Sequence, residues 1–241
     1  MTFGISWLAN NSNLALYSES PGMAYLGQPS YYASLDAVKD LYRISCVNQP
    51  LVFIEIVNAT DCVAIQDVTQ VSTGVWEIKV LNCTYSTRLN NAPTKCSPTL
   101  HCFAPLSSGS GSSYGLRMWD SSGNITFDSN SGMLIPKQFS DAAAYSGAGE
   151  GVSSYSYSGL TRPAFVAHGS GGSGARQQRI GLTSSADSYT YGQVWNSNAA
   201  GVLYRVAQVV LHTVVNSSIS NPWTMRYSAN TILFTDISLY V

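Results

Sequence analysis

Residues 114–133 read YGLRMWDSSGNITFDSNSGM, and residues 3–23 read FGISWLANNSNLALYSESPGM. Laid over each other without gaps, both stretches open with an aromatic residue and a glycine, and their apolar positions coincide. Each has small polar residues between two apolar runs, and Asn and Gly accept the positive φ of tight turns, so each predicts a β-hairpin. The opening residues are Phe3 and Gly4 in the first stretch and Tyr114 and Gly115 in the second.

The correspondence continues further along the chain. QPLVFIEI (49–56) lies about as far after the first opening as TRPAFVAH (161–168) lies after the second, which places Phe53 over Phe165. Just before the second opening the chain is rich in Ser and Gly, as flexible linkers are. We therefore expect a duplication, with two collinear β-modules at 1–106 and 113–241 joined by a linker at 107–112.

Strand patterns dominate both halves. GVWEIKVLNC (74–83) alternates Val75, Glu77 and Lys79 with apolar residues, which is the period of a half-buried strand. Short apolar runs separated by Gly, Ser, Asn and Pro predict an all-β fold of two tandem sandwich-like domains. The exception is the segment 30–44, where apolar residues recur at helical spacing and predict a short helix or helical turn, with a covering loop as the alternative.

The charge content limits the kinds of partner. Charged residues make up 10% of the chain, where roughly 25% is typical, and the net charge is −1. Nucleic-acid binding needs clustered Lys and Arg, and the sequence has no such cluster, so we expect no nucleic-acid partner. No apolar run reaches the roughly 18 residues of a membrane helix, so no membrane span is expected. The opening residues also lack the basic stretch of a secretory signal, which favours assembly in a cytoplasm.

All five cysteines lie in the first half of the chain, without any C-x-x-C pair. KCSPTLHC (95–102) places His101 beside Cys102, but adjacent residues of a strand point to opposite faces, which disfavours a shared metal. We expect buried free thiols; a zinc site and one disulfide formed after release are the alternatives. No metal and no cofactor are predicted.

Catalytic patterns are weak. HGSGGSG (168–174) contains a formal G-x-G-x-x-G, but no helix pattern or suitably placed acidic residue follows it, so a dinucleotide site is not expected. Glu55 and Glu77 are the best pair for a glycosidase, although both are expected to point outward. We predict no catalytic residues and a protein that is not an enzyme.

The second half is rich in Tyr, Ser and Gly, a composition that suits recognition surfaces because rigid aromatic contacts combine with adaptable hydrogen bonds. The same residues also occur on ordinary β-sheet surfaces. The candidates for contact with a partner or receptor are Tyr145, Tyr155, Tyr157, Tyr189, Tyr191 and Trp195.

The stretch YGLRMWDSSGNITFDS resembles the opening of small β-domains in bacteriophage tail-tip, baseplate and tail-fibre-associated proteins. The first copy departs from that pattern, since Ser12 replaces the turn glycine and LYS (16–18) replaces FDS (127–129). The motif is structural and carries no catalytic residue. Its matching positions are Tyr114, Gly115, Gly123, Phe127, Asp128 and Ser129.

The resemblance implies a structural protein of a phage virion, assembled in the host cytoplasm and forming a homo-oligomer within a three- or sixfold tail assembly. Its partners would be a tail hub or fibre and, at the other end, a host-surface glycan or protein. A carbohydrate-binding receptor module is one alternative, and a collar or capsid decoration protein is another. A depolymerase is the third, for which the glutamate pair is the only support in the sequence.

Overall fold

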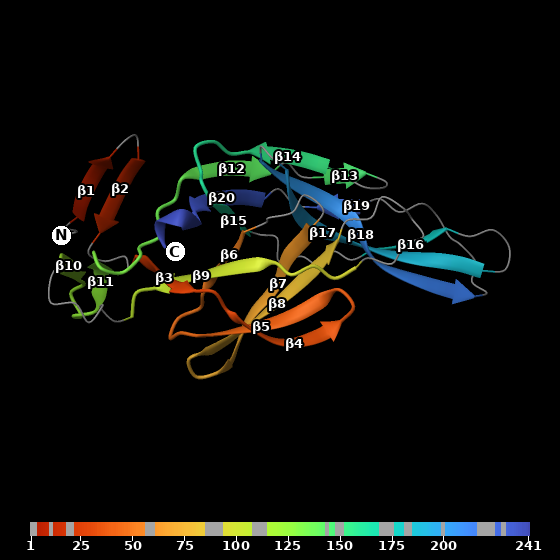
Figure 1. The fold of residues 1–241 in the computed structure, drawn as a ribbon, viewed down its shortest axis with the longest axis horizontal. Coiled ribbons are helices and arrows are strands. Elements are labelled where there is room, and N and C mark those ends of the chain that lie inside the picture. The colour runs from red at the N-terminus through yellow and green to blue at the C-terminus, as the bar shows by residue number, and fades with distance from the viewer. Residues whose placement is uncertain are drawn as a thin grey trace.

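The structure is a computed structural model of the chain (Figure 1). It describes residues 4–9, 12–17, 22–55, 61–84, 94–107, 115–142, 145–147, 152–168, 176–180, 185–198, 201–215, 225–227 and 230–241. Side chains are described for residues 22–55, 61, 63–84, 94–107, 115–139, 157–166 and 232–241.

The all-β class is confirmed, because every regular element of the described residues is a strand except one short 3-10 turn, η1 (Ile237–Leu239). The first nine strands are β1 (Gly4–Ala9), β2 (Ser12–Tyr17), β3 (Met23–Gly27), β4 (Ser30–Asp36), β5 (Lys39–Ser45), β6 (Leu51–Glu55), β7 (Asp61–Ser72), β8 (Val75–Thr84) and β9 (Thr99–Pro105). The others are β10 (Arg117–Trp119), β11 (Ile125–Asp128), β12 (Gln138–Ala142), β13 (Tyr145–Gly147), β14 (Val152–Ser156), β15 (Pro163–His168), β16 (Arg176–Ile180), β17 (Ser185–Asn198), β18 (Gly201–Val215), β19 (Met225–Tyr227) and β20 (Asn230–Asp236).

The short helix predicted at 30–44 is wrong, because this segment forms the antiparallel hairpin β4–β5 with Asp36 opposite Lys39. The Asp36 carboxylate accepts a hydrogen bond from the backbone N–H of Val38 at 2.8 Å. An Asp that bonds the backbone two residues on stabilises a tight turn, which competes with the helix. Along β5, Asp40 and Tyr42 are buried between more exposed neighbours, so burial follows the strand period.

Two large sheets form the body of the molecule. One has six strands in the order β12-β20-β15-β6-β9-β3, and the other has eight, in the order β14-β18-β17-β7-β8-β5-β4 with β16 paired to β17. Both sheets contain strands from 1–106 and from 113–241. The division expected at 107–112 therefore does not separate the sheets.

The strand order shows that the two halves are structural repeats. In the six-stranded sheet, β3-β9-β6 from the first half matches β12-β20-β15 from the second, and β6 meets β15 where Ile54 lies opposite Phe165. In the larger sheet, β5-β8-β7 matches β14-β18-β17, and β7 meets β17 where Val63 lies opposite Trp195. Equivalent strands are thus antiparallel neighbours in both sheets, which is the arrangement that an approximate two-fold axis produces.

The structure corrects the residue correspondence by one position. Phe53 packs with Phe103 and Ala164 on one face of the six-stranded sheet, whereas Phe165 packs with Ile54 on the other. Residues related by a two-fold axis perpendicular to a sheet share a face, so Phe165 corresponds to Ile54. This pair has the same spacing in sequence as the aromatic residues that open the two hairpins.

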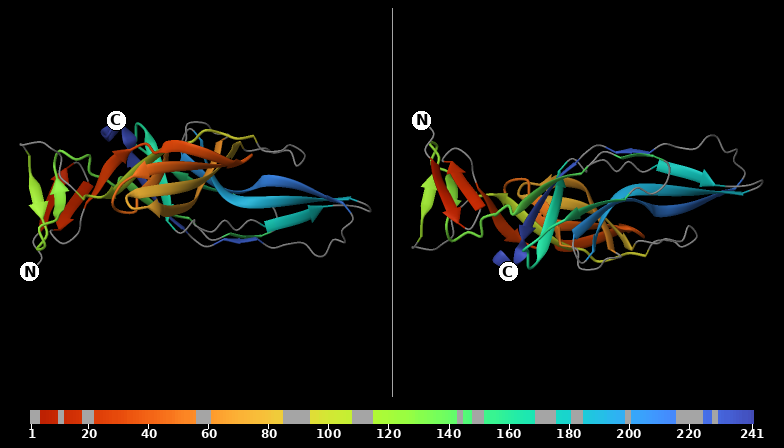
Figure 2. Two further views of the ribbon diagram at one scale, coloured as in Figure 1. Left: turned by 90° about the horizontal axis from the view of Figure 1, so that it is seen from below. Right: turned by 90° about the horizontal axis from the view of Figure 1, so that it is seen from above.

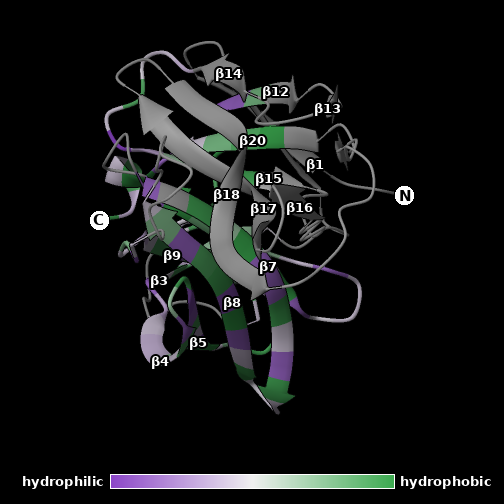
Figure 3. Cartoon of the chain, turned by 90° about the vertical axis from the view of Figure 1, so that its right-hand side faces the viewer, coloured by the Kyte–Doolittle hydropathy of each residue, from purple (hydrophilic) through white to green (hydrophobic). Residues whose placement is uncertain are grey.

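Two apolar cores lie on the two faces of the six-stranded sheet. The core between the sheets contains Ile78 and Val80 of β8, together with Ile54, Phe165 and Phe234 of the six-stranded sheet. Figure 3 shows the hydrophobic and hydrophilic residues alternating along β7 and β8, and for β8 this is the alternation that the sequence predicts. The second core is covered by η1 and the chain end. Its members are Phe53, Phe103, Ala164 and Ile237, with Met23, Tyr25, Leu51, Leu134, Val166, Leu233 and Tyr240 packed against them.

The two predicted hairpins are confirmed as the antiparallel pairs β1–β2 and β10–β11. They lie together at one end of an elongated molecule, opposite the end formed by β16, β17 and β18 (Figures 1 and 2). The segments that follow them pair with each other, since the N–H of Tyr25 donates to the carbonyl of Gly132 and the N–H of Leu134 donates to that of Met23, both at 2.7 Å. This pairing brings the β3 edge of the six-stranded sheet against the segment that leads into β12, so the sheet curls around the second core.

Candidate functional site

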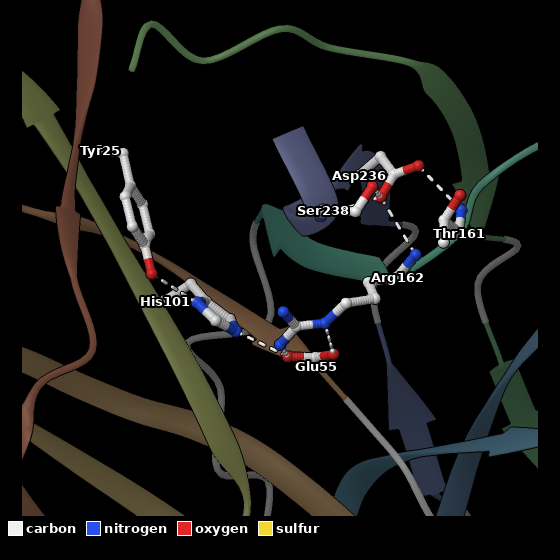
Figure 4. Close-up of polar contacts among 7 residues, drawn as sticks. All are labelled: Tyr25, Glu55, His101, Thr161, Arg162, Asp236 and Ser238. Atoms are coloured by element: carbon white, nitrogen blue, oxygen red, sulfur yellow. Dashed lines mark hydrogen bonds and ion pairs between the residues drawn. The ribbon is translucent and has the colours of Figure 1, made fainter. Parts of the chain in front are cut away.

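Five polar residues from both repeats gather beside the second core, and Figure 4 shows them with two neighbours. They are Tyr25 on β3, Glu55 on β6, His101 on β9, Arg162 directly before β15 and Asp236 at the end of β20, here called the polar cluster. His101 lies opposite Phe53 in the β6–β9 register, so the strand pleat directs it and Glu55 to the same face of the sheet.

The Glu55 carboxylate is the centre of the polar cluster. Its Oε1 accepts from Nε of Arg162 and its Oε2 accepts from Nη2 of Arg162, both at 2.9 Å, which is the two-pronged geometry that guanidinium and carboxylate groups favour. Oε2 also lies 2.7 Å from Nε2 of His101, and the Tyr25 hydroxyl lies 3.0 Å from Nδ1 of His101. With Nδ1 accepting from Tyr25 and Nε2 donating to Glu55, a neutral imidazole satisfies both contacts.

Asp236 fixes the backbone that carries Arg162. Its carboxylate accepts hydrogen bonds from the backbone N–H groups of Thr161 (2.8 Å), Arg162 (3.0 Å) and Ser238 (3.0 Å) and from the Ser238 hydroxyl (2.7 Å). Burial opposes ionisation of Asp236, but these hydrogen bonds hold its pKa below the ordinary value. The carboxylate thus stays charged and holds Arg162 in place.

Burial affects the pKa values of the residues in the polar cluster in different ways. It would raise the pKa of Glu55, but the hydrogen bonds and charges of Arg162 and His101 bring that pKa below its ordinary value. For His101, burial disfavours the charged form more strongly than Glu55 favours it, so its pKa is lowered. Burial also raises the pKa of Tyr25. At neutral pH the polar cluster therefore holds an ionised Glu55 and Arg162 with neutral His101 and Tyr25.

Chemically, this arrangement connects the repeats. Glu55 and His101 come from the first repeat, whereas Arg162 and Asp236 come from the second, and the His101 side chain is fully buried. Because each group contacts another member, the polar cluster is a cross-link of hydrogen bonds close to the Ile54–Phe165 junction. Sequence reasoning missed it, since Glu55 was expected to point outward; that prediction is wrong, because Glu55 is 9% exposed. Its proposed partner Glu77 lies in the other sheet and pairs with Arg43.

Cys46, Cys83 and Cys102 are free thiols, and no three His, Cys, Asp or Glu side chains of the described residues lie together so that they could hold a metal ion. His101 and Cys102 alternate as expected: His101 joins the polar cluster, and Cys102 packs in the core between the sheets. Burial raises the pKa of Cys102 to about 12, which keeps this thiol protonated.

The residues of the hairpin motif join the open end of the β10–β11 hairpin, where β10 begins and β11 ends. Gly115 has φ +130°, and a β-carbon there would collide with the side chains of Ser129 and Asn130. The Ser129 hydroxyl accepts from the N–H of Leu116 at 2.9 Å, and the buried Asp128 pairs with Arg117 at 2.9 Å. The motif residues are therefore those that hold the start of β10 against the end of β11.

The other motif positions are also explained by the backbone. Gly123 has φ +83° in the turn, as the sequence predicts, and Phe127 lies opposite Met118. Gly4 begins β1 opposite Tyr17. Phe3 and Tyr114 lie outside the described residues.

The β10–β11 hairpin exposes two large apolar side chains. Trp119 is 53% exposed and Leu116 is 44% exposed. An exposed Trp is costly to leave in water and is the residue most enriched where partners bind. The hairpin end of the molecule is therefore a candidate docking surface.

The six aromatic contact candidates lie on or beside the strands β13, β14 and β17, and of their side chains the structure describes that of Tyr157. Tyr157 is half-buried, with its ring centroid 5.8 Å from that of Phe234 in the core. The other five lie on strands whose side chains at these positions are outside those described. Their strands are β13 for Tyr145, β14 for Tyr155 and β17 for Tyr189, Tyr191 and Trp195.

Comparisons with protein-family models, with curated proteins and with solved structures gave no match. Among the described residues, no helix has the length and apolar character needed to cross a membrane.

Proposed function

We propose that the chain is a non-enzymatic structural protein of a bacteriophage virion, located at the tail tip or baseplate, where its hairpin end docks on the tail hub or a fibre. The observation that carries this proposal is the placement of both aromatic-Gly hairpins at one end, with Trp119 and Leu116 exposed on one of them. The resemblance of the hairpin motif to phage tail β-domains supports a phage particle. The low charge of the chain suits association through shape and aromatic contact.

The opposite end would face a neighbouring subunit or the host surface. The hairpin of β17 and β18 forms most of this end, and β17 carries Tyr189 and Tyr191 opposite β16 residues Gln178 and Arg176. Trp195 lies further back, opposite Val63 at the junction with β7. In this proposal Tyr189 and Tyr191 are the outer contact residues, and the chain assembles as a homo-oligomer that follows the symmetry of the tail.

Immuno-gold electron microscopy of intact phage particles, with an antibody to this chain, tests the location. Label at the tail tip is the expected result. Label over the capsid would keep the virion class but overturn the tail proposal, and particles without any label would overturn both.

Docking through the hairpin end is tested separately with Trp119→Ala. Incorporation of the variant into particles should fall at least tenfold, because loss of a buried interface Trp costs about 2 kcal/mol or more. Phe139→Ala is the matched control, since Phe139 is 66% exposed and belongs to β12, which Figure 1 shows apart from the two hairpins. Equal incorporation of both variants would contradict docking through this end.

A further inference from the structure

A second set of polar side chains lies away from the polar cluster, where β5, β8 and the segment before β9 meet. The Asp40 carboxylate bridges two side chains: its Oδ1 lies 2.7 Å from Nζ of Lys95, and its Oδ2 accepts from Nδ2 of Asn82 at 2.7 Å. One carboxylate therefore joins a primary amine, which is a nucleophile once deprotonated, to a primary amide, which is an acyl donor.

The side-chain amide of Asn82 is isolated from solvent, and its hydrogen-bonding capacity is only partly used. Asn82 is fully buried and Asp40 is 4% exposed. The Asn82 Nδ2 group donates to both Asp40 and the carbonyl of Cys96, which fixes its orientation. In the described part of the structure its Oδ1 is buried without a hydrogen-bond partner. Unsatisfied buried oxygens are rare in folded proteins and call for an explanation.

The amine is held in a fixed position as well. Nζ of Lys95 contacts the Ser34 hydroxyl at 2.6 Å and the Lys39 carbonyl at 3.3 Å, in addition to Asp40. The backbone of Lys95 bridges that of Cys83, the neighbour of Asn82. Nucleophile, proton acceptor and acyl group are thus fixed by paired backbone, which lowers the entropic cost of bringing them together.

The geometry points to an intramolecular isopeptide bond between Lys95 and Asn82, with Asp40 as the proton-transfer group. Asp40 takes a proton from the Lys95 ammonium, and the neutral Nζ attacks Cγ of Asn82. The bond between Cγ and Nδ2 then breaks while the bond between Cγ and Nζ remains. The two protons that Lys95 loses leave with the amide nitrogen as an ammonium ion, and Asp40 returns to its carboxylate form. No oxidant or other reactant is needed, and burial of Asn82 keeps competing water away.

The bond would lock the segment before β9 to β8 covalently, which suits a protein that must stay folded outside a cell. Its formation does not depend on the proposed virion function, because the three residues and their contacts lie within one chain.

Intact-mass measurement and a tryptic map of the full-length protein test the proposal. The mass of the matured wild type should be lower than the sequence mass by one ammonia. Trypsin should fail to cut after Lys95, so that peptide 80–88 appears joined to peptide 89–117. Asp40→Asn and Lys95→Arg should both keep the full mass, whereas Asp36→Asn, a matched change in the same hairpin, should still lose ammonia.

The wild-type map keeps the test valid even if a variant fails to fold. Wild-type protein at full mass after prolonged incubation, with peptides 80–88 and 89–95 released separately, would overturn the proposal. A gain of mass at Asn82 would overturn it too, because it would show that water attacks the amide. Loss of ammonia in Asp40→Asn would overturn the role of Asp40.

Discussion

Ile54 of β6 and Phe165 of β15 lie opposite each other at the centre of the six-stranded sheet, and they are 111 residues apart in the chain. Phe3 and Tyr114, the openings of the two hairpins, have the same separation. The pair therefore lies close to the approximate two-fold axis between the repeats. Both residues belong to the core that the two sheets share, so the repeats are expected to fold as one unit.

Phe165→Ala should lower the free energy of unfolding by about 3–5 kcal/mol, because Phe165 is 1% exposed and its loss leaves a cavity. Phe139→Ala, at an exposed position, should change it by less than about 0.5 kcal/mol. Chemical denaturation followed by fluorescence and circular dichroism measures both. Since the repeats share a core, the wild type should unfold in a single transition. Two separate transitions would show that the repeats are independent.

Glu55→Gln should lower the free energy of unfolding by about 1.5–3 kcal/mol, because it removes the charge that Arg162 and His101 contact in a buried place. The matched change Glu77→Gln disrupts a partly exposed pair with Arg43 and should cost less than about 1 kcal/mol. Thermal and urea denaturation of both variants gives the comparison. Equal costs would mean that the polar cluster contributes no more than a surface ion pair.

The stability of the protein should fall as the pH drops below about 6.5. Folding lowers the pKa of His101 from its ordinary value of 6.5, so below that pH the unfolded chain binds a proton that the folded chain does not. The contribution of neutral His101 to the free energy of unfolding is complete above pH 6.5. It is lost as the pH falls through the lower pKa that His101 has in the folded state. Glu55, with an ordinary pKa of 4.5 that is also lowered, acts only at more acidic pH.

The measurement is urea denaturation of wild type and His101→Gln between pH 7.5 and 5. The variant should be less stable at neutral pH but should lose less stability on acidification, and the other histidines cancel in the comparison. Parallel curves for the two proteins would show that His101 does not titrate differently on folding.

Gly115→Ala should destabilise the β10–β11 hairpin by roughly 1–2 kcal/mol, because an L-residue is strained at φ +130° and its β-carbon meets Ser129 and Asn130. Hydrogen exchange should show faster exchange at the amides of Leu116 and Ser129, which lie in the affected pairing. Ser122→Ala, in the exposed turn of the same hairpin, is the control. Unchanged exchange in Gly115→Ala would mean that the hairpin tolerates the added side chain.

Local chemistry allowed several features to be predicted from the sequence. The hairpins, the turn at Gly123 and the alternation along β8 depend on φ preferences and on a period of two, and both are properties of neighbouring residues. The duplication was also visible, because the hairpin motif repeats at a constant spacing. The helix prediction at 30–44 failed because apolar spacing alone does not reveal the turn that Asp36 forms.

Tertiary structure decided how the repeats combine and which polar residues meet. A sequence does not specify whether two β-modules stay apart or pair their edges, and pairing β6 with β15 and β7 with β17 is what buries Phe165 and Glu55. Once Glu55 is buried it requires a cation, and Arg162, distant in sequence, supplies one. Asn82, Lys95 and Asp40 likewise meet because three separate segments pair. The sequence alone determined the two hairpins, the turn at Gly123 and the alternation along β8, because these depend on near neighbours in the chain, whereas the polar cluster arises from long-range pairing that only the folded chain provides.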